Sequence, residues 1–281
     1  MTKFLKSLGI LMLMLTVFTT FSCSDNDDNT PAWHSLAGEY TGWTSGKFAY
    51  SPTPIATDNE KITIAVNDGK MSLQLVSNQW GTATVAEVTV VENGGSYRLT
   101  GNGSATLSMH GGAGSQYDCT LDGTISKDRK TADITIAYPA VMGGTTVTFT
   151  LGEAPAAKLV AGSYSGWTKG DCAYFKNRTQ NGEKLAIAAN EDGTADITLT
   201  SEMWGATTIQ AVKVEKTDNG FTFSGTGKFT MGMNGSSSQY DCTLAGTMNA
   251  DKDTYSITFS MPAVMGGLDI TFAQGDAPSA E

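Results

Sequence analysis

The sequence predicts an all-β protein, made of two tandem eight-stranded antiparallel barrels whose strands follow one another up and down. Three observations predict this fold. The second half of the chain repeats the first, apolar residues alternate with polar ones over short runs, and glycine-containing turns separate those runs. Strands that are joined only by hairpins and have one apolar face protect their edges best by closing into a barrel.

The repeat covers two whole domains. Residues 36–43, LAGEYTGW, return 124 positions later as VAGSYSGW, and Trp80 returns as Trp204 at the same offset. Further along the chain the offset is 123, so that SQYDCTL of the first unit recurs at 238–244 and PAVMGG recurs at 262–267. A period this long indicates duplication of a domain, because solenoid repeats are much shorter.

Within each unit, short runs alternate between apolar and polar residues. Ile62, Ile64 and Val66 alternate with more polar neighbours, Asp68-Gly69 interrupts the pattern, and the alternation then resumes. An Asp-Gly pair between two such runs is typical of a β-hairpin. The second unit repeats the arrangement, and the further turns give about eight strands per unit and no convincing helix.

The first 22 residues have the features of a secretory signal peptide. Lys3 and Lys6 form a basic start, and the apolar run that follows them is too short to span a bilayer comfortably. Residues 20–23, TFSC, resemble a bacterial lipobox, which implies a lipid on Cys23 as the first residue of the mature chain. The alternative is ordinary secretory cleavage that leaves Cys23 without a lipid.

A short acidic segment follows Cys23. Residues 24–29, SDNDDN, cannot bury apolar surface, so residues 23–35 are expected to form a flexible tether. The segment resembles the acidic export tags of Bacteroidetes surface lipoproteins, which implies a lipid-anchored protein on the outer membrane that faces the cell exterior. The alternative is a plain spacer on the periplasmic side.

The rest of the chain divides between the two units. The first barrel is expected over residues 36–153 and the second over residues 160–276, with a linker at 154–159 and a tail at 277–281. Apart from the signal peptide, no stretch of the sequence is long and apolar enough for a transmembrane helix. The membrane is therefore expected to be contacted through the N-terminal lipid only.

The charge of the mature chain excludes one class of partner. Loss of the signal peptide removes Lys3 and Lys6 from 18 basic side chains and none of the 28 acidic ones, which leaves a net charge of −12. Nucleic acid is not an expected partner, because its phosphates need a basic surface.

The cysteines do not indicate catalysis. In SQYDCTL, alternation sends Tyr117, Cys119 and Leu121 to the interior face of a strand, where cysteine usually acts as a small buried apolar residue. A nucleophilic cysteine needs a base, normally histidine, yet His34 and His110 both lack a counterpart in the other unit. No catalytic residue, metal site or cofactor is expected, because the chain also has no P-loop and no zinc-ligand spacing.

Cys172 and Cys242 are the remaining cysteines, and their pairing stays open. Three cysteines beyond Cys23 are an odd number, so at least one thiol is free in a monomer. Strands in an up-and-down order do not bring Cys172 and Cys242 together readily. Buried free thiols are therefore favoured over a disulfide.

The repeated aromatic residues are the candidates for ligand binding. Trp80 and Trp204 each precede a glycine at the end of an apolar strand, which predicts a loop at the mouth of each barrel. Two interpretations stand: these indoles stack on a sugar ring or an apolar ligand, or they plug the barrel end. The other members of this candidate set are Trp43, Trp167, Tyr117 and Tyr240, of which the two tryptophans look more structural.

The motif G-x-Y-x-G-W at the start of each unit, the glycine-broken strands and the late PAVMGG resemble the calycin-like β-barrel domain of Bacteroidetes lipoproteins. The resemblance covers both units and implies two calycin-like barrels. Calycins include lipocalins and avidin-like proteins, which hold small apolar ligands inside the barrel. The chain departs from the lipocalin signature, because Tyr40 and Tyr164 stand where that signature has tryptophan.

The predicted barrels and the resemblance to the calycin-like domain indicate two alternative functions. The first is a non-catalytic cell-surface lipoprotein that binds a small apolar or glycan ligand in its barrels. The alternative is a protein–protein interaction module, such as an inhibitor, an adhesin or a subunit of a surface complex, whose barrels are plugged by their own side chains. Barrels of eight strands lie near the boundary between filled and ligand-holding interiors, so the sequence leaves both open.

Overall fold

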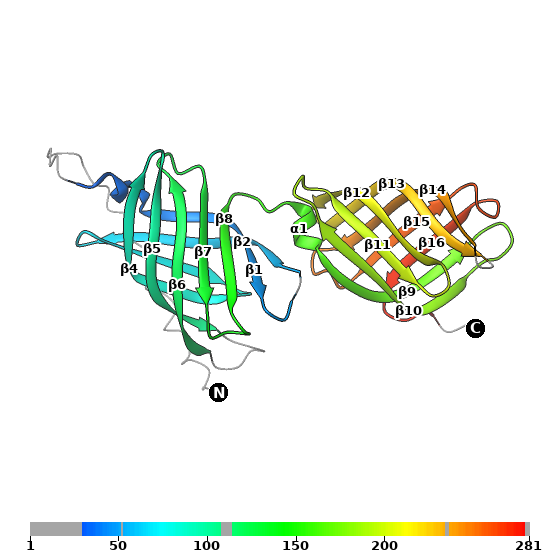
Figure 1. Ribbon diagram of the computed structural model, residues 1–281, viewed down its shortest axis with the longest axis horizontal. Helices are drawn as coiled ribbons and strands as arrows, with labels where there is room; N and C mark the ends of the chain where they lie inside the picture. The colour runs from blue at the N-terminus through cyan, green and yellow to red at the C-terminus, as the bar shows by residue number, and fades with distance from the viewer. Residues whose placement is uncertain (1–29, 52, 108–113, 234–235, 279–281) are drawn as a thin grey trace, which may run out of the picture. The chain divides into compact units, whose positions relative to one another are not determined.

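The computed structural model of the protein describes residues 30–51, 53–107, 114–233 and 236–278 (Figure 1). Within these ranges, sixteen strands and two five-residue helices make up the regular structure. The first eight strands close into one barrel and the last eight into another, and neighbouring strands run antiparallel. The predicted fold class, two tandem eight-stranded up-and-down barrels, is confirmed.

The strands of the first barrel follow one another in sequence order around the sheet. They are β1 (Gly38–Phe48), β2 (Ile55–Asn67), β3 (Lys70–Ser77), β4 (Gly81–Asn93), β5 (Ser96–Leu107), β6 (Ser115–Ser126), β7 (Ala132–Tyr138) and β8 (Thr145–Leu151).

The second barrel repeats this order. Its strands are β9 (Gly162–Asp171), β10 (Arg178–Ala189), β11 (Ala195–Ser201), β12 (Gly205–Thr217), β13 (Gly220–Met233), β14 (Ser236–Asn249), β15 (Tyr255–Met261) and β16 (Leu268–Gln274).

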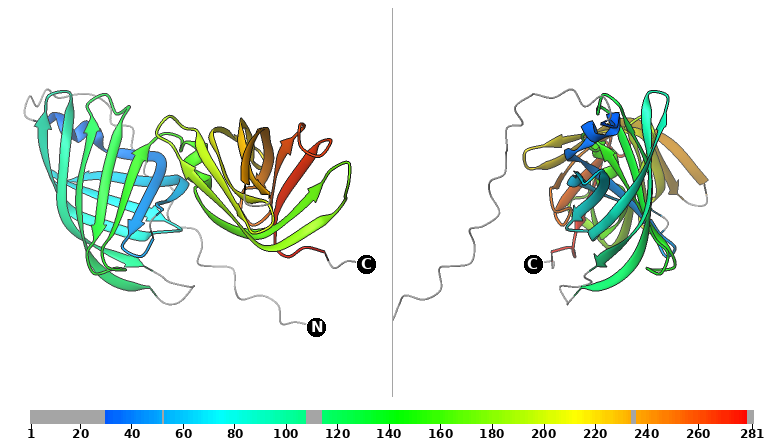
Figure 2. Two further views of the ribbon diagram at one scale, coloured as in Figure 1. Left: turned by 45° about the vertical axis from the view of Figure 1, so that its right-hand side comes forward. Right: turned by 90° about the vertical axis from the view of Figure 1, so that its left-hand side faces the viewer.

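The turn between β2 and β3 shows how the sequence sets the strand register. Asp68 and Gly69 both have positive φ, 50° and 72°, which is the combination that a type I′ turn requires. Closure depends on the first strand, which pairs on both sides: Gly42 of β1 lies opposite Glu60 of β2 and Leu151 of β8. The left view in Figure 2 shows the strands of each unit curving around an interior.

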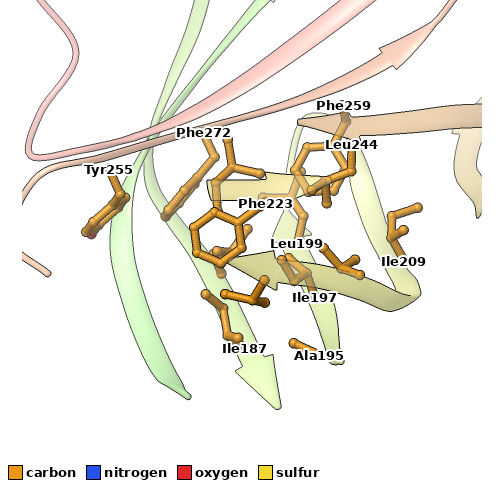
Figure 3. Close-up of a cluster of buried hydrophobic side chains, with 14 of the residues drawn as sticks. Ile187, Ala195, Ile197, Leu199, Ile209, Phe223, Leu244, Tyr255, Phe259 and Phe272 are labelled. Atoms are coloured by element: carbon orange, nitrogen blue, oxygen red, sulfur yellow. The ribbon is translucent and has the colours of Figure 1, made fainter. Parts of the chain in front are cut away.

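Alternate residues of every strand fill that interior. In β6, Cys119 and Leu121 are buried while Asp118 and Thr120 are exposed, as the alternation in SQYDCTL predicts. Figure 3 shows the interior of the second barrel, where large side chains such as Phe223, Phe259 and Phe272 from different strands meet. These rings interdigitate with aliphatic side chains in the second barrel. A separate cluster of buried apolar residues fills the first barrel, so each barrel has a packed apolar core.

The two short helices were not expected from the sequence. The 3-10 helix η1 (Ala32–Leu36) occupies the end of the predicted tether, and the helix α1 (Ala156–Val160) occupies most of the predicted linker. Leu36 and Val160, the last residues of these helices, are fully buried against the barrels that they precede. Each barrel therefore begins with one helical turn, which is too short for a periodic pattern to reveal.

The same contacts hold both helices. The hydroxyl of Tyr40 donates to Leu36 O at 2.6 Å, and that of Tyr164 donates to Val160 O at 2.7 Å. Arg129 donates to Ser35 O at 3.3 Å, and its counterpart Lys252 donates to Leu159 O at 3.1 Å. We call this the helix end of each barrel. Its contacts explain the tyrosine in G-x-Y-x-G-W, which caps a helix rather than contacting a ligand.

The signal peptide and Cys23 lie outside the described residues, as does His110. In the part of the chain that the structure describes, neither helix has the length or the apolar character needed to cross a bilayer.

Candidate functional site

The predicted Trp80 and Trp204 lie in equivalent turns, between β3 and β4 and between β11 and β12. Their side chains turn inward, and only 7% and 5% of their surface is exposed. The Trp80 indole Nε1 donates to Thr44 Oγ1 at 3.0 Å, and Trp204 Nε1 donates to Thr168 Oγ1 at 2.9 Å. We call this the Trp end of each barrel.

Two glycines make room for these indoles. A Cβ atom placed on Gly46 of β1 would lie 2.0 Å from Trp80 Cζ2, and one placed on Gly170 of β9 would lie 2.4 Å from Trp204 Cη2 and Cζ2. Both distances are well inside van der Waals contact, so each ring rests directly on the glycine backbone. The geometry favours the interpretation that these tryptophans plug the barrel ends.

A serine and a glutamate complete the cluster in each barrel. Ser77 Oγ accepts the backbone N–H of Trp80 at 2.9 Å, and Ser201 Oγ accepts that of Trp204 at 2.9 Å. The same hydroxyls bond to the carboxyl groups of Glu60 and Glu183. The chain of contacts from carboxyl to serine to tryptophan to threonine is therefore copied in both units.

The two glutamates are the unexpected members of this cluster. Glu60 and Glu183 are only 4% and 2% exposed, and the Oε2 atom of each has no hydrogen-bond partner within the part of the chain that the structure describes. Burial raises the pKa of both carboxyls, and the serine hydrogen bonds offset only part of that effect. For Glu183, a backbone N–H from Glu202 also opposes the rise in pKa.

The two Trp ends differ in two respects. In the first barrel, the hydroxyl of Tyr138 is buried, has no partner among the described residues, and has its pKa raised by burial. In the second barrel Met261 takes that position, and Phe175 stacks on Trp204 with 6.2 Å between ring centres. The copied framework therefore carries different side chains in the two copies.

The thiols do not form a reactive site. Cys119, Cys172 and Cys242 are all buried and free, so the disulfide between the last two does not form. Burial raises the pKa of Cys119, and it raises the pKa of Cys242 to about 11, which keeps both protonated at neutral pH. In the described ranges, no three histidine, cysteine, aspartate or glutamate side chains gather as metal ligands.

The other predicted aromatic residues do not join the Trp ends. Trp43 and Trp167 alternate out of phase with the inward-facing threonines of β1 and β9, so they face the outside of the wall. Trp167 Nε1 donates to Gln274 O at 3.1 Å, a contact between the two strands that close the second barrel. Tyr117 and Tyr240 lie half-buried at equivalent positions of β6 and β14.

A polar hollow of about 500 Å³ lies on the wall of the second barrel. The hollow forms where β12 and β13 separate. In the described residues, the two strands pair where residues 213–217 of β12 lie opposite residues 220–224 of β13. Beyond these pairs, Thr207 Oγ1 donates to Lys228 O at 3.1 Å and accepts the N–H of Thr230 at 3.3 Å. The lining residues include Thr198, Thr208, Gln210, Lys228, Thr230 and Gln239.

Sequence reasoning missed the glutamates, although a signal for them exists. Glu60 stands in phase with Ile62 and Ile64, and Glu183 stands in phase with Leu185 and Ile187, so alternation sends both carboxyls inward. It also missed the threonine and serine partners, because short polar residues in a strand give no comparable signal.

These features define a class of protein: closed, eight-stranded, up-and-down antiparallel barrels with packed interiors. The model of the calycin-like beta-barrel domain matches residues 36–151 and again residues 160–274. The chain therefore belongs to the calycin-like beta-barrel domain family, in two tandem copies, as its resemblance implied.

Among solved structures, a candidate outer membrane protein of Bacteroides fragilis is similar in fold. It is 24% identical, with a TM-score of 0.67 over 87% of this chain and 99% of that one. Transferrin binding protein B of Neisseria meningitidis also matches, at 11% identity and a TM-score of 0.28 over 78% of this chain and 52% of that one. The second likeness is too weak to carry an argument. No curated protein is significantly similar to the chain in sequence.

Proposed function

We propose that the chain is a non-catalytic surface lipoprotein whose two barrels are rigid modules for protein recognition. The observation that carries this proposal is the burial of Trp80 and Trp204 at the Trp ends. A lipocalin-type site needs an open mouth and a cavity below it. Here an indole occupies each mouth, a helical turn covers the opposite end, and apolar side chains fill the space between. Recognition then falls to the outer surface.

The absence of catalysis belongs to the same proposal. Burial raises the pKa of the two carboxyls at the Trp ends, which favours their neutral form. The thiols of Cys119 and Cys242 are held protonated in the core. Groups of this kind specify packing inside a barrel more readily than they activate a substrate.

Cys23 anchors the protein to the outer membrane in this account, and the acidic tether carries the barrels to the cell exterior. The TFSC sequence and the acidic segment that follows it support both statements. Labelling cells with radioactive palmitate tests the anchor: the wild-type protein should take up label, and Cys23→Ser should not. Protease added to intact cells should degrade the wild-type barrels, whereas survival of the protein would place it on the periplasmic face.

Native mass spectrometry tests the filled interior. The mature chain carrying Cys23→Ser is purified gently from its own host and is then challenged with lipids and with neutral oligosaccharides. We expect the mass of the bare polypeptide before and after the challenge. A discrete added lipid mass that disappears on denaturation would establish a ligand-holding barrel and overturn the proposal. An added oligosaccharide mass would do so only if it persisted in the Gln210→Leu variant, which removes a side chain of the hollow on the outer wall.

The hollow on the second barrel supports a second candidate function, the binding of a small glycan. Its threonine hydroxyls, glutamine amides and Lys228 suit a ligand rich in hydroxyl groups, and its volume of about 500 Å³ lies in the range of ligand sites. Titration of neutral oligosaccharides followed by NMR tests it, with Gln210→Leu as the site variant and Gln74→Leu on the first barrel as the control. Binding that only Gln210→Leu abolishes would support the glycan site.

A further inference from the structure

The two barrels present a tyrosine to solvent at the same place. Tyr50 and Tyr174 occupy equivalent positions, 124 residues apart, in the loops that follow β1 and β9. Their exposed fractions are 79% and 81%, the highest among the large apolar side chains in the described residues. A tyrosine that is this exposed contributes little to packing, so its presence in both copies calls for another reason.

The loop that carries Tyr174 is well ordered by its own hydrogen bonds. Tyr174 N–H donates to Cys172 Sγ at 3.3 Å, and Cys172 N–H donates to Phe175 O at 2.9 Å. Asn177 N–H donates to Asp171 Oδ1 at 2.7 Å and closes the loop. The tyrosine ring is thus presented on a fixed backbone, which lowers the entropy cost of binding.

Phe175 ties this loop to the plug of the barrel. Its ring stacks on Trp204 at 26°, and the guanidinium of Arg178 lies 5.8 Å from the ring centre on the same Phe175. Arg178, Phe175 and Trp204 therefore form one continuous stack from the surface into the Trp end. The rigid interior supports the side chains that surround Tyr174.

A second loop packs beside each tyrosine. Ala173 N–H donates to Met265 O at 3.3 Å, and a Cβ atom on Gly266 would lie 2.9 Å from Ala173 Cβ. In the first barrel, a Cβ atom on Gly143 would lie 2.9 Å from Ala49 Cβ. This second loop is the repeated PAVMGG. The close approach explains the first glycine of each pair, and a positive φ explains the second, 102° at Gly144 and 101° at Gly267. The residue before each pair is a methionine, and Met142 is 38% exposed.

The charge around the two tyrosines differs. Lys176 and Arg178 follow Tyr174, and both are exposed. The acid of the same loop, Asp171, is paired with Lys169 at 3.0 Å and also interacts electrostatically with Lys176, so the cations outnumber it. Residues 51–54 of the first barrel, SPTP, have no charge. In a chain of net charge −10, the Tyr174 loop is a local cationic surface. An acidic partner would be repelled by much of the molecule and attracted here.

We propose that the loops of Tyr50 and Tyr174, each with the neighbouring PAVMGG loop, are the docking surfaces for a protein partner. Tyrosine, methionine and arginine are the residue types enriched at protein interfaces, and an apolar centre with a polar rim is the usual arrangement. At the second barrel the partner presents acidic side chains to Lys176 and Arg178 around a pocket for the Tyr174 ring. This inference rests on the proposed function.

Photo-crosslinking on living cells of the host locates the partner. Full-length chains carry p-benzoylphenylalanine at position 50, 174 or 91; Val91 is the control, because it is also exposed but lies at the end of β4. The crosslinked protein is identified, produced in pure form, and its affinity for the purified chain is measured at low and high salt. We expect the same protein at positions 50 and 174 and none at position 91.

The affinity measurements decide whether the docking proposal holds. Tyr174→Ala and the double substitution Lys176→Glu with Arg178→Glu should each weaken binding at least tenfold, and raised salt should weaken wild-type binding. Val91→Ala and Lys184→Glu, a charge reversal on β10, should leave affinity unchanged, and all variants should keep the wild-type melting temperature. An affinity insensitive to the Tyr174 and Lys176/Arg178 substitutions overturns the inference.

The remaining outcomes also decide between the proposals. Crosslinking to carbohydrate instead of protein, or no crosslink at positions 50 and 174, overturns this inference. A partner captured only at position 91 overturns it as well but leaves protein recognition by the outer surface standing. An added mass inside the barrel in native mass spectrometry overturns the proposed function itself.

Discussion

Trp80 and Trp204 fill space that two glycines leave open, and this residue-scale contact decides how each barrel ends. An indole can lie on Gly46 or Gly170 because the added carbon of any other residue would overlap the ring. The threonine that receives the indole N–H and the serine that receives the backbone N–H then fix its orientation. The plug is therefore specified by its neighbours rather than by tryptophan alone.

Substituting these glycines tests the plug. Gly46→Ala and Gly170→Ala should each displace an indole and lower the free energy of unfolding by about 1–3 kcal/mol, because the core has no room for the added carbon. Urea denaturation followed by tryptophan fluorescence measures the change. Gly95→Ala is the matched control, since a Cβ atom there meets nothing within 4 Å. Wild-type stability in both site variants would contradict the plug.

The buried glutamates make stability depend on pH in a defined direction. Burial raises the pKa of Glu60 and Glu183 above the usual 4.5, so the folded protein keeps protons that the unfolded chain has released. Their contribution to stability is full below that value and is lost as pH rises through the raised native pKa. Replacing both with glutamine should therefore stabilise the protein at neutral pH, by about 1–3 kcal/mol.

Urea unfolding at pH 4.5 and pH 7.5 measures this effect as the difference in the free energy of unfolding between the variant and the wild type. The stability gained by Glu60→Gln with Glu183→Gln should grow as pH rises, while Glu39→Gln, at an exposed position of β1, should show no such trend. A gain that is the same at both pH values would show that the carboxyls are not held neutral in the native state.

At the scale of single residues, the candidate site could be predicted only in part from the sequence. The repeat identified Trp80 and Trp204, and their place before a glycine correctly indicated a turn at the barrel end. Whether an indole in a turn points inward depends on Gly46 and Gly170, which lie some 34 residues away along the chain. Contacts of that separation cannot be read from local alternation, so both interpretations stayed open until the structure placed the rings.

At the scale of elements, the contrast between β4–β5 and β12–β13 shows how one side chain changes a barrel wall. In the first barrel, Ala83 lies opposite Ala105, in the short paired stretch that precedes a register shift between Thr84 and Thr89. In the second barrel Thr207 takes the place of Ala83, and its hydroxyl bridges to Lys228 O and Thr230 N–H instead. The polar hollow lies along this altered seam.

Thr207→Val tests whether the hydroxyl holds the seam together. Valine keeps the shape of threonine but leaves the Lys228 carbonyl and the Thr230 N–H without this partner, which should cost about 1–3 kcal/mol. Amide hydrogen exchange should also accelerate at Thr230. Thr226→Val, at an exposed position of β13, serves as the control. If exchange at Thr230 stays slow, the strands close the ladder as in the first barrel, and the hydroxyl bridge is dispensable.

The strands were the most predictable elements, and the helices were the least. Alternation around Ile62 and Ile64, with Asp68-Gly69 as the turn, is a local signal that the structure reproduces. The helices η1 and α1 each have five residues, and their stability comes from tertiary contacts such as the Tyr40 and Tyr164 hydroxyls. A single turn held in this way leaves no periodicity in the sequence.

At the scale of the whole molecule, duplication has preserved the framework and altered the surface. Both barrels keep the helix end, the Trp end with its buried glutamate, and an exposed tyrosine. They differ in the seam at Thr207, in the residue opposite the plug, and in the charge that follows the tyrosine. The differences at Thr207 and at Tyr138 or Met261 are buried, whereas the difference in charge after the tyrosine lies on the surface, where a partner could contact it.

Hydrogen exchange of the five tryptophan indole N–H groups, followed by NMR on protein with ¹⁵N-labelled tryptophan, tests the filled barrels most directly. Trp80→Phe and Trp204→Phe assign the two resonances of interest. We expect both of these N–H groups to persist long after transfer to D₂O, and to keep their chemical shifts when apolar ligands are added. Exchange of both within the dead time, or shifts on addition of ligand, would mean that the barrels are open and that the account is wrong.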